Sequence, residues 1–202
     1  MKDIVILGAG GHAKVLFDAC RSSGRTVRGF LDADPAGPGL FGVPVLGTDD
    51  MLSEDGFLDR VEVAVGLGLP HVHRRVTQRC IDAGAAFAQV THASATISDF
   101  VEIGAGSFVN AGAIINAATR VGRHCIVNTR VSIDHDCVLG DFVNISPGAV
   151  LAGEVRCADG VFIGTGAAIG PGVTIGQDAV IGAGAIILCD VDAGAKIVGT
   201  HR

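Results

Sequence analysis

A histidine followed directly by an aspartate, His135 and Asp136, is the pair of side chains in this sequence best suited to moving a proton. An imidazole accepts a proton near neutral pH, and a neighbouring carboxylate can orient the ring and stabilise its charged form. A general base of this kind is one requirement of acyl transfer, together with room for a tetrahedral intermediate and a donor to its oxyanion. Which chemistry is possible then depends on the element that holds the pair.

The pair lies within a long stretch in which an aliphatic residue recurs at every sixth position. From Ile97 to Ile187 these positions hold Val, Ile or Leu, with Cys157 as the exception, and a small or β-branched residue follows most of them by four positions. Neither an α-helix nor an isolated strand has this period, whereas a six-residue repeat is typical of a parallel β-helix. Three hexads would close a triangular coil of about eighteen residues, with glycine or asparagine at the corners.

This repeat predicts the surroundings of His135. The histidine is at an outward position of the hexad Ile133–Val138, and stacking by one coil makes Ala117 and Gly153 its neighbours. Because both neighbours are small, we expect an acceptor molecule to have space to reach the imidazole.

The chain before the repeat has a different pattern, in which buried strands alternate with helices. Three strands are predicted, over Ile4–Leu7, Val27–Leu31 and Val61–Val65, and a glycine turn leads from the first into a helix. Such a βαβαβ unit is half of a dinucleotide-binding fold and has the size for one nucleotide. The sequence therefore predicts two domains: an α/β half-Rossmann domain over residues 1–92 and a β-helix over residues 93–202.

The glycine turn has two interpretations. Gly8, Gly10 and Ala13, followed by Asp32, satisfy the fingerprint of dinucleotide-binding folds, in which the carboxylate binds a ribose of NAD. The lack of the second half of such a fold, and a β-helix in place of a hydride-transfer domain, argue against NAD. Amides at a helix N-terminus bind phosphate in any nucleotide, so we expect the turn and His12 to form a phosphate site.

The composition argues against several classes of protein. The net charge of -6 and the absence of Trp and Tyr disfavour broad nucleic-acid binding. No segment resembles a signal peptide or a membrane span, which predicts a cytoplasmic protein. The six cysteines have no paired spacing, so neither a disulfide framework nor a zinc site is expected. A zinc hydratase on a similar β-helix would need converging histidines, and these do not stack by whole coils: His92, His124, His135 and His201.

Taken together, these segments resemble a known family. The chain is similar to sugar acetyltransferases of the sialic acid O-acetyltransferase type, whose relatives include bacillosamine and perosamine N-acetyltransferases. The motifs that carry the resemblance occur in the order GAGGHAKV, FLDAD, AVGLG, NTRVSIDHDCVLGDFVNISPGAVLAG and IGTGAAIGPGVTIG. The resemblance implies a left-handed β-helix, a homotrimer with active sites between subunits, acetyl-CoA as co-substrate, no metal, and a nucleotide-linked amino sugar bound by the N-terminal domain.

The resemblance also implies roles for individual residues. It makes His135 the general base and Asp136 its acidic helper, and it suggests that amides near Gly153 serve the oxyanion or the thioester. The further residues that it indicates are Asn144, Thr165 and Ala183 on the acetyl-CoA side, and Gly10, Gly11, His12, Asp32 and Gly66 on the nucleotide side.

The chain departs from the family pattern at three places. Asn144 stands where relatives often have a second histidine, and an amide can bind a thioester but cannot act as a base. Ala33 replaces a frequent second acid after Asp32. The chain has Gly199–Arg202 where relatives commonly have a Gly-x-Pro-Ala motif over the coenzyme, which predicts a shorter C-terminal lid.

The leading hypothesis is direct N-acetylation. The amine of a nucleotide-linked 4-amino-deoxy sugar, with UDP favoured, attacks the thioester of acetyl-CoA while His135 removes a proton. The alternative is O-acetylation of a sugar hydroxyl, such as that of sialic acid, and the residues alone do not distinguish the two. A β-helix protein that binds a nucleotide without catalysis is the third hypothesis.

Overall fold

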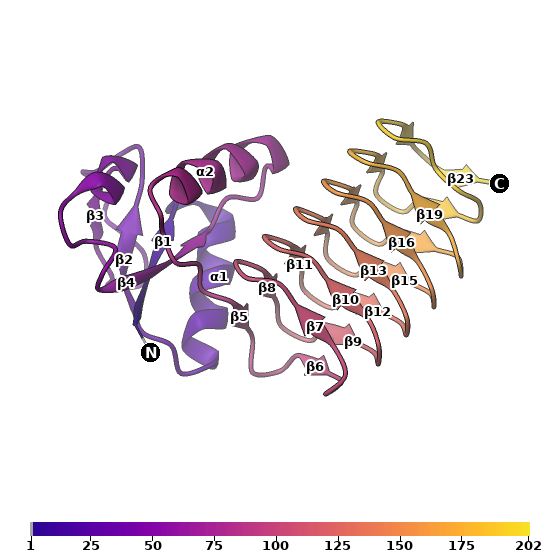
Figure 1. The fold of residues 1–202 in the computed structure, drawn as a ribbon, viewed down its shortest axis with the longest axis horizontal. Helices are drawn as coiled ribbons and strands as arrows, with labels where there is room; N and C mark the ends of the chain where they lie inside the picture. Colours follow the sequence, from indigo (N-terminus) through magenta and orange to yellow (C-terminus); the bar gives the residue numbers. More distant parts are fainter. Residues whose placement is uncertain (1) are drawn as a thin grey trace. The chain divides into compact units, whose positions relative to one another are not determined.

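The computed structural model describes residues 2–202, and the chain divides into two compact units (Figure 1). The first unit ends at Thr91 and the second extends from His92 to Arg202, so this division falls one residue before the boundary placed from the sequence. Each unit has a hydrophobic core of its own.

The first unit is built on a parallel sheet of four strands in the order β3-β2-β1-β4. The central strand β1 is almost completely buried from Ile4 to Leu7, because it has a neighbouring strand on each side and is covered on its faces. The elements of this unit are β1 (Asp3–Leu7), α1 (Gly11–Ser22), β2 (Val27–Leu31), β3 (Val45–Gly47), the 3-10 helix η1 (Asp49–Ser53), β4 (Val61–Val65), α2 (Pro70–Asp82) and β5 (Val90–Thr91).

The connection between β2 and β4 differs from the predicted βαβαβ unit. It contains the edge strand β3, which the sequence did not predict, and the 3-10 helix η1, which agrees with the short helix predicted around Asp49 to Leu52. Glycine and proline are frequent from residue 35 to residue 44, and both residue types disfavour an α-helix. The connection therefore adds an edge strand to the sheet.

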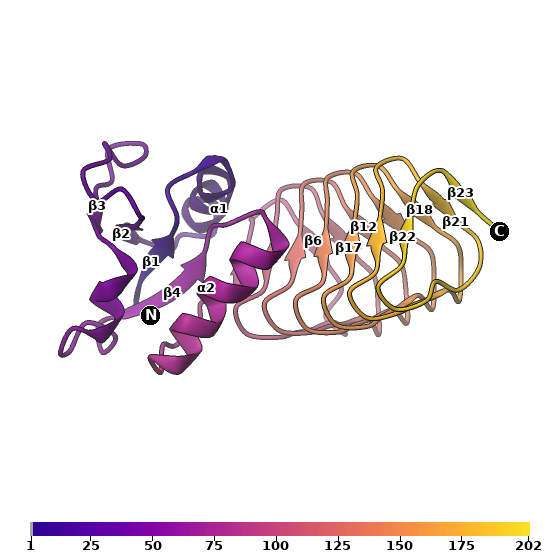
Figure 2. The same cartoon turned by 90° about the horizontal axis from the view of Figure 1, so that it is seen from above.

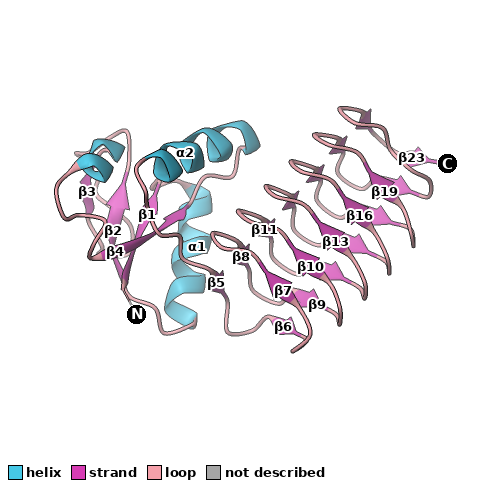
Figure 3. Ribbon diagram, in the orientation of Figure 1, coloured by secondary structure: helices cyan, strands magenta, loops and turns pink. Residues whose placement is uncertain are grey.

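Helix α1 begins directly after the glycine turn, as the sequence predicted. Its buried face packs through Leu16, Phe17 and Cys20, and the helix ends before Gly24, whose φ of 73° is in the left-handed region. Because β1, β2 and β4 are parallel, their carboxyl ends meet at one edge of the sheet (Figure 3). This edge is the usual ligand-binding position in open α/β folds.

The second unit is a left-handed parallel β-helix whose coils stack on one another (Figure 2). Each of its strands is two residues long and is followed by a corner. The strands are β6 (Thr96–Ile97), β7 (Glu102–Ile103), β8 (Phe108–Val109), β9 (Ile114–Ile115), β10 (Arg120–Val121), β11 (Ile126–Val127), β12 (Ser132–Ile133), β13 (Val138–Leu139), β14 (Asn144–Ile145), β15 (Val150–Leu151), β16 (Arg156–Cys157), β17 (Phe162–Ile163), β18 (Ala168–Ile169), β19 (Thr174–Ile175), β20 (Val180–Ile181), β21 (Ile186–Ile187), β22 (Lys196–Ile197) and β23 (Thr200–His201).

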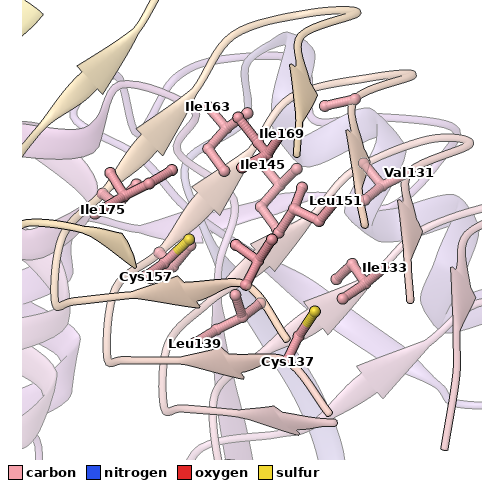
Figure 4. Close-up of a cluster of buried hydrophobic side chains, with 14 of the residues drawn as sticks. Val131, Ile133, Cys137, Leu139, Ile145, Leu151, Cys157, Ile163, Ile169 and Ile175 are labelled. Atoms are coloured by element: carbon pink, nitrogen blue, oxygen red, sulfur yellow. The ribbon is translucent and has the colours of Figure 1, made fainter. Parts of the chain in front are cut away.

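These strands form three parallel sheets, one for each face of the triangular coil. Within the second unit their orders are β19-β16-β13-β10-β7, β22-β20-β17-β14-β11-β8 and β23-β21-β18-β15-β12-β9-β6. Strand partners are one coil apart, as in the pairing of Val121 with Leu139. The aliphatic residues of the repeat point into the coil and form a continuous core, as Figure 4 shows for Ile145, Leu151 and Ile163.

The corners differ from the expectation that glycine or asparagine would occupy them. One residue in most corners has a positive φ, and it is often neither of these two types, for example Ala118, His124, Asp136, Phe142 and Glu154. Backbone hydrogen bonds to the neighbouring coil hold such residues in place, as in the bond of 2.9 Å from Phe142 N to Arg123 O. The stacked coils therefore stabilise a conformation that costs an isolated L-residue roughly 1–2 kcal/mol.

The regular spacing ends in the last coil. Val180 pairs with Lys196 and Ile186 pairs with Thr200, so these partners are 16 and 14 residues apart, whereas Val121 and Leu139 are 18 apart. The coil that carries β22 and β23 is therefore shorter than the others.

Candidate active site

His135 lies in the corner between β12 and β13, and its side chain points outward. Its Nδ1 lies 2.8 Å from Asp136 Oδ2, and 54% of the histidine side chain is exposed to solvent. A carboxylate can only accept, so this hydrogen bond places the proton on Nδ1 and leaves the lone pair of Nε2 directed outward. The bond to Asp136, with the nearby charge of Asp134, raises the pKa of His135 above its ordinary value. The pair that the sequence indicated is formed within one corner.

Hydrogen bonds from the adjacent coil fix the backbone of this corner. Asp134 Oδ1 accepts from the amide of His135 at 2.8 Å and from Asn116 Nδ2 at 2.9 Å, and the bond from Asn116 is the main cause of the lowered pKa of Asp134. Asp136 N donates to Ala117 O at 3.1 Å, and Glu154 N donates to His135 O at 2.9 Å. The corner therefore presents the imidazole from a rigid backbone.

Gly153 lies against His135, and its indicated role toward the oxyanion or the thioester stays a prediction. A Cβ atom at this position would lie 2.7 Å from Cε1 and 2.8 Å from Nε2 of His135, so the imidazole ring lies directly against the glycine. The sequence suggested that the small residue leaves space for an acceptor, whereas in the structure it leaves space for the ring itself. The backbone of Gly153 supports the orientation of the imidazole.

The residues indicated for acetyl-CoA lie elsewhere on the β-helix. Thr165 is in a corner between β17 and β18, and Ala183 lies one coil further along the same edge, where Gly184 N donates to Thr165 O at 2.8 Å. Both are exposed, whereas Asn144, within β14, is only 7% exposed. Within one chain these residues are therefore on other parts of the triangular coil than His135, and their role in coenzyme binding stays a prediction.

In the first unit, the glycine turn lines a cavity of about 360 Å³. Asp32 Oδ2 accepts from the amide of Ala9 at 2.6 Å, so this carboxylate fixes the loop that carries Gly10 and Gly11. Lys14 also lines the cavity. The combination of exposed loop amides, a helix N-terminus and a lysine is suited to a phosphate group.

A second cavity, of about 590 Å³, lies at the carboxyl ends of β1, β2 and β4 and also includes Asp32 in its wall. Its walls are mainly aliphatic, and Arg75 and Arg79 of α2 provide positive charge. Arg79 is paired with Asp49 at 2.5 Å. From the sequence, Arg75 is interpreted as part of a basic helical surface and Arg79 is not singled out; the run of basic residues near the start of α2 is the available signal.

His12 and Gly66 both lie close to the start of α1, and their roles in nucleotide binding stay predictions. Gly66 is buried, and a Cβ there would lie 2.8 Å from Ile6 Cγ2 and 2.9 Å from the Cβ of Ala13, so the glycine permits β1, β4 and α1 to pack closely. His12 is partly buried at the start of α1, and burial lowers its pKa. A neutral imidazole at this position can bind a substrate through a hydrogen bond but adds no charge.

Neither a metal centre nor a membrane span is found among residues 2–202. No group of three or more His, Cys, Asp or Glu side chains in this range could hold a metal ion. No helix in the same range is long and apolar enough to cross a membrane.

Comparisons with known proteins bear on both units. The family described as the PglD N-terminal domain matches residues 3–80, and the family described as bacterial transferase hexapeptide (six repeats) matches residues 154–189. No curated protein matches the chain in sequence.

Solved structures match the chain along nearly its whole length. Perosamine N-acetyltransferase from Caulobacter crescentus, a mutant in complex with CoA and GDP-perosamine, is 36% identical with a TM-score of 0.93, and the alignment covers 98% of this chain and 94% of that chain. The acetyltransferase domain of PglB from Neisseria gonorrhoeae FA1090, in complex with acetyl coenzyme A, is 34% identical with a TM-score of 0.90 and coverages of 98% and 96%. The chain belongs to the hexapeptide-repeat sugar acetyltransferases.

WeeI from Acinetobacter baumannii AYE is a further similar structure, with 28% identity, a TM-score of 0.86 and coverages of 98% and 97%. The chain is an acetyl-CoA-dependent sugar acetyltransferase of this family. The narrower resemblance to the sialic acid O-acetyltransferase type stays a prediction.

Proposed function

We propose that the protein N-acetylates a 4-amino-deoxy sugar linked to a nucleoside diphosphate, with His135 as general base. The observation that carries this proposal is the exposed His135–Asp136 pair on a β-helix whose family transfers acetyl groups from acetyl-CoA. The structure of the perosamine enzyme in complex with GDP-perosamine supports a nucleotide-linked amino sugar as acceptor.

The reaction needs one base that later acts as an acid. The sugar nitrogen attacks the thioester carbonyl carbon, and Nε2 of His135 takes a proton from that nitrogen as the new C–N bond forms. Collapse of the tetrahedral intermediate breaks the C–S bond, and the imidazolium returns the proton to the leaving thiolate. Asp136 keeps the proton on Nδ1 in both steps and stabilises the charged ring between them.

The two cavities of the first unit are proposed as the nucleotide site. Backbone amides near Gly10 and Gly11 would bind the diphosphate, and the larger, mainly aliphatic cavity beside Asp32 would hold the base. The resemblance in sequence favours UDP, whereas the similar perosamine enzyme holds GDP-perosamine.

A homotrimer with active sites between subunits is part of the proposal. The face that contains β9, β15 and β21 exposes large aliphatic side chains on alternate strands, where Ile114, Val150 and Ile186 are 42%, 47% and 44% exposed. Such a face is suited to contact with another copy of the chain. In an assembly of this kind, one subunit's His135 could face another subunit's Thr165 and Ala183. Analytical ultracentrifugation should give three times the mass of one chain; a monomer would contradict this part of the proposal.

The substrate is tested first by binding and then by turnover. A thermal-shift screen with UDP-, GDP-, dTDP- and CMP-linked sugars should show stabilisation by the correct nucleotide, because a ligand that binds only the folded state raises the melting temperature. Release of CoA thiol is then measured with 4-amino sugars on that nucleotide. Turnover with a sugar hydroxyl, such as that of sialic acid, and none with the amines would overturn the proposal in favour of O-acetylation.

The general base is tested by His135→Ala. We expect turnover to fall by at least ~100-fold, the scale for loss of a general base, while the melting temperature and the oligomeric state are retained. A variant that keeps near-normal turnover would reject His135 as the base.

A further inference from the structure

The corner that carries His135 is closed in a different way from most other corners of the β-helix. In many corners, an amide donates directly to the carbonyl three residues earlier, as Ala149 N does to Ser146 O at 3.3 Å and Val131 N does to Asn128 O at 3.2 Å. In the His135 corner, the hydroxyl of Thr119 is inserted between the two groups. It donates to Asp134 O at 2.7 Å and accepts from Cys137 N at 3.1 Å. The turn is thereby widened by one oxygen atom.

Thr119 is completely buried, and it comes from the adjacent coil, directly before β10. Its two hydrogen bonds hold the residues on either side of the pair His135 and Asp136. A similar contact occurs in the next coil. There Cys137 Sγ lies 3.2 Å from the carbonyl oxygen of Ala152, the residue before Gly153, against which the imidazole lies. Both backbone segments that support the ring are therefore fixed from inside the β-helix.

The fold does not require a hydroxyl at this position. At most other inward positions of this kind the residue is Val or Ala, for example Val131, Val143 and Ala149, and these have no side-chain hydrogen-bonding group. We infer that Thr119 is a positioning residue for the reaction, whose inserted hydroxyl sets the direction in which the imidazole and its carboxylate leave the β-helix. This inference rests on the proposed role of His135.

The chain contains a matched control. Ser107 is also completely buried and is inserted in the same way in the corner from Gly122 to Cys125: its Oγ donates to Gly122 O at 2.8 Å and accepts from Cys125 N at 3.0 Å. That corner is on another edge of the coil and does not contain His135. Removal of either hydroxyl breaks two equivalent hydrogen bonds. Only the hydroxyl of Thr119 supports the corner of the proposed base.

The test compares Thr119→Val, Thr119→Ser and Ser107→Ala in the full chain. We expect Thr119→Val to lower kcat at least ~10-fold, the scale for misplacing a catalytic group, with KM for both substrates changed less than about twofold. Thr119→Ser should restore most of kcat because it restores the hydroxyl. Ser107→Ala should keep kcat within about twofold while lowering the melting temperature as much as Thr119→Val does.

A titration of the His135 imidazole by NMR tests the inference without a substrate. In Thr119→Val its pKa should move down toward the ordinary value, since the bond to Asp136 is loosened, and in Ser107→Ala it should stay as in the parent. If Thr119→Val does not fold, Thr119→Ala replaces it, since alanine occupies the equivalent position elsewhere. Unchanged kcat and titration in Thr119→Val or Thr119→Ala, or an equal loss of kcat in Ser107→Ala, would overturn the inference. Because the titration needs no turnover, its result is independent of whether the proposed acceptor is correct.

Discussion

Two histidines of the β-helix, His124 and His135, lie in similar corners and have opposite properties. Each ring lies against a glycine of an adjacent coil: a Cβ at Gly106 would be 2.3 Å from Nδ1 of His124, and one at Gly153 would be 2.7 Å from Cε1 of His135. His124 is 7% exposed and stacks on Phe142 with ring centroids 5.1 Å apart, and burial lowers its pKa. His135 is exposed and bonded to a carboxylate, and its pKa is raised.

The partner of each ring therefore decides its role, since the glycine support is common to both. An aromatic partner and burial favour the neutral imidazole and make His124 a packing residue. A carboxylate partner and exposure give His135 a basic nitrogen that a substrate can reach. Substitutions at the two glycines and the two partners separate these roles.

The largest effect on turnover in this comparison is expected from Gly153→Ala. The added methyl group must displace the His135 ring, which is the free end of an exposed side chain, so we expect turnover to fall on the order of 100-fold. The free energy of unfolding should change by less than about 1 kcal/mol, because the ring can move into solvent. Steady-state kinetics and urea denaturation of the same preparation measure both. Turnover within a few-fold of the parent would show that the position of the ring against Gly153 does not matter.

The equivalent change at the other histidine, Gly106→Ala, should have the reverse effect. Gly106 has a φ of 73°, and the buried, stacked ring of His124 cannot move aside, so we expect a loss of about 2 kcal/mol in the free energy of unfolding. Turnover below the melting transition should stay near that of the parent. A variant that is as stable as the parent would indicate that the packing around His124 adapts.

A smaller effect on turnover is expected for Asp136→Asn. The hydrogen bond that Asp136 accepts is the largest cause of the raised pKa of His135, and the base must be neutral to act. The acidic limb of the kcat/KM profile should therefore move to lower pH in the variant, while the plateau falls about 10-fold because the ring is held less well. If the acidic limb of the kcat/KM profile stays at the same pH in the variant, a group other than His135 controls it.

The smallest effect concerns the stability of His124 at acidic pH. Its pKa in the folded state is lowered, mainly by burial and further by Arg123, with Asp141 opposing. As the pH falls, the histidine of the unfolded chain therefore takes up a proton before that of the folded chain. This contribution to the free energy of unfolding is fully present above the ordinary histidine pKa. It decreases as the pH falls from there toward the pKa in the folded state, by at most about 1.4 kcal/mol per pH unit. His124→Asn, which does not titrate and tolerates the positive φ, should reduce this slope in denaturation curves from pH 8 to pH 5. Equal slopes would assign the effect to His12, whose pKa is also lowered by burial.

The spacing of side chains along the chain determined most of the fold. The six-residue recurrence from Ile97 to Ile187 fixed the β-helix, the inward residues and the neighbours of His135 one coil away, because a regular coil converts a sequence interval directly into a position in space. The glycine turn and the buried strand before it predicted the start of α1. The adjacency of His135 and Asp136 predicted their pairing, since a corner residue can turn its side chain toward that of the next residue.

Only the tertiary structure decided what each side chain touches. No sequence interval shows that the imidazole lies against Gly153, that Asp32 binds the amide of Ala9, or that the Thr119 hydroxyl is inserted into the corner of His135. These contacts depend on rotamers and on small shifts between stacked coils and loops, and the same residue types at the same spacing permit several of them. His124 holds the positive-φ position of its corner and His135 comes one residue before that position, but only the structure shows that the first ring is buried and the second is exposed.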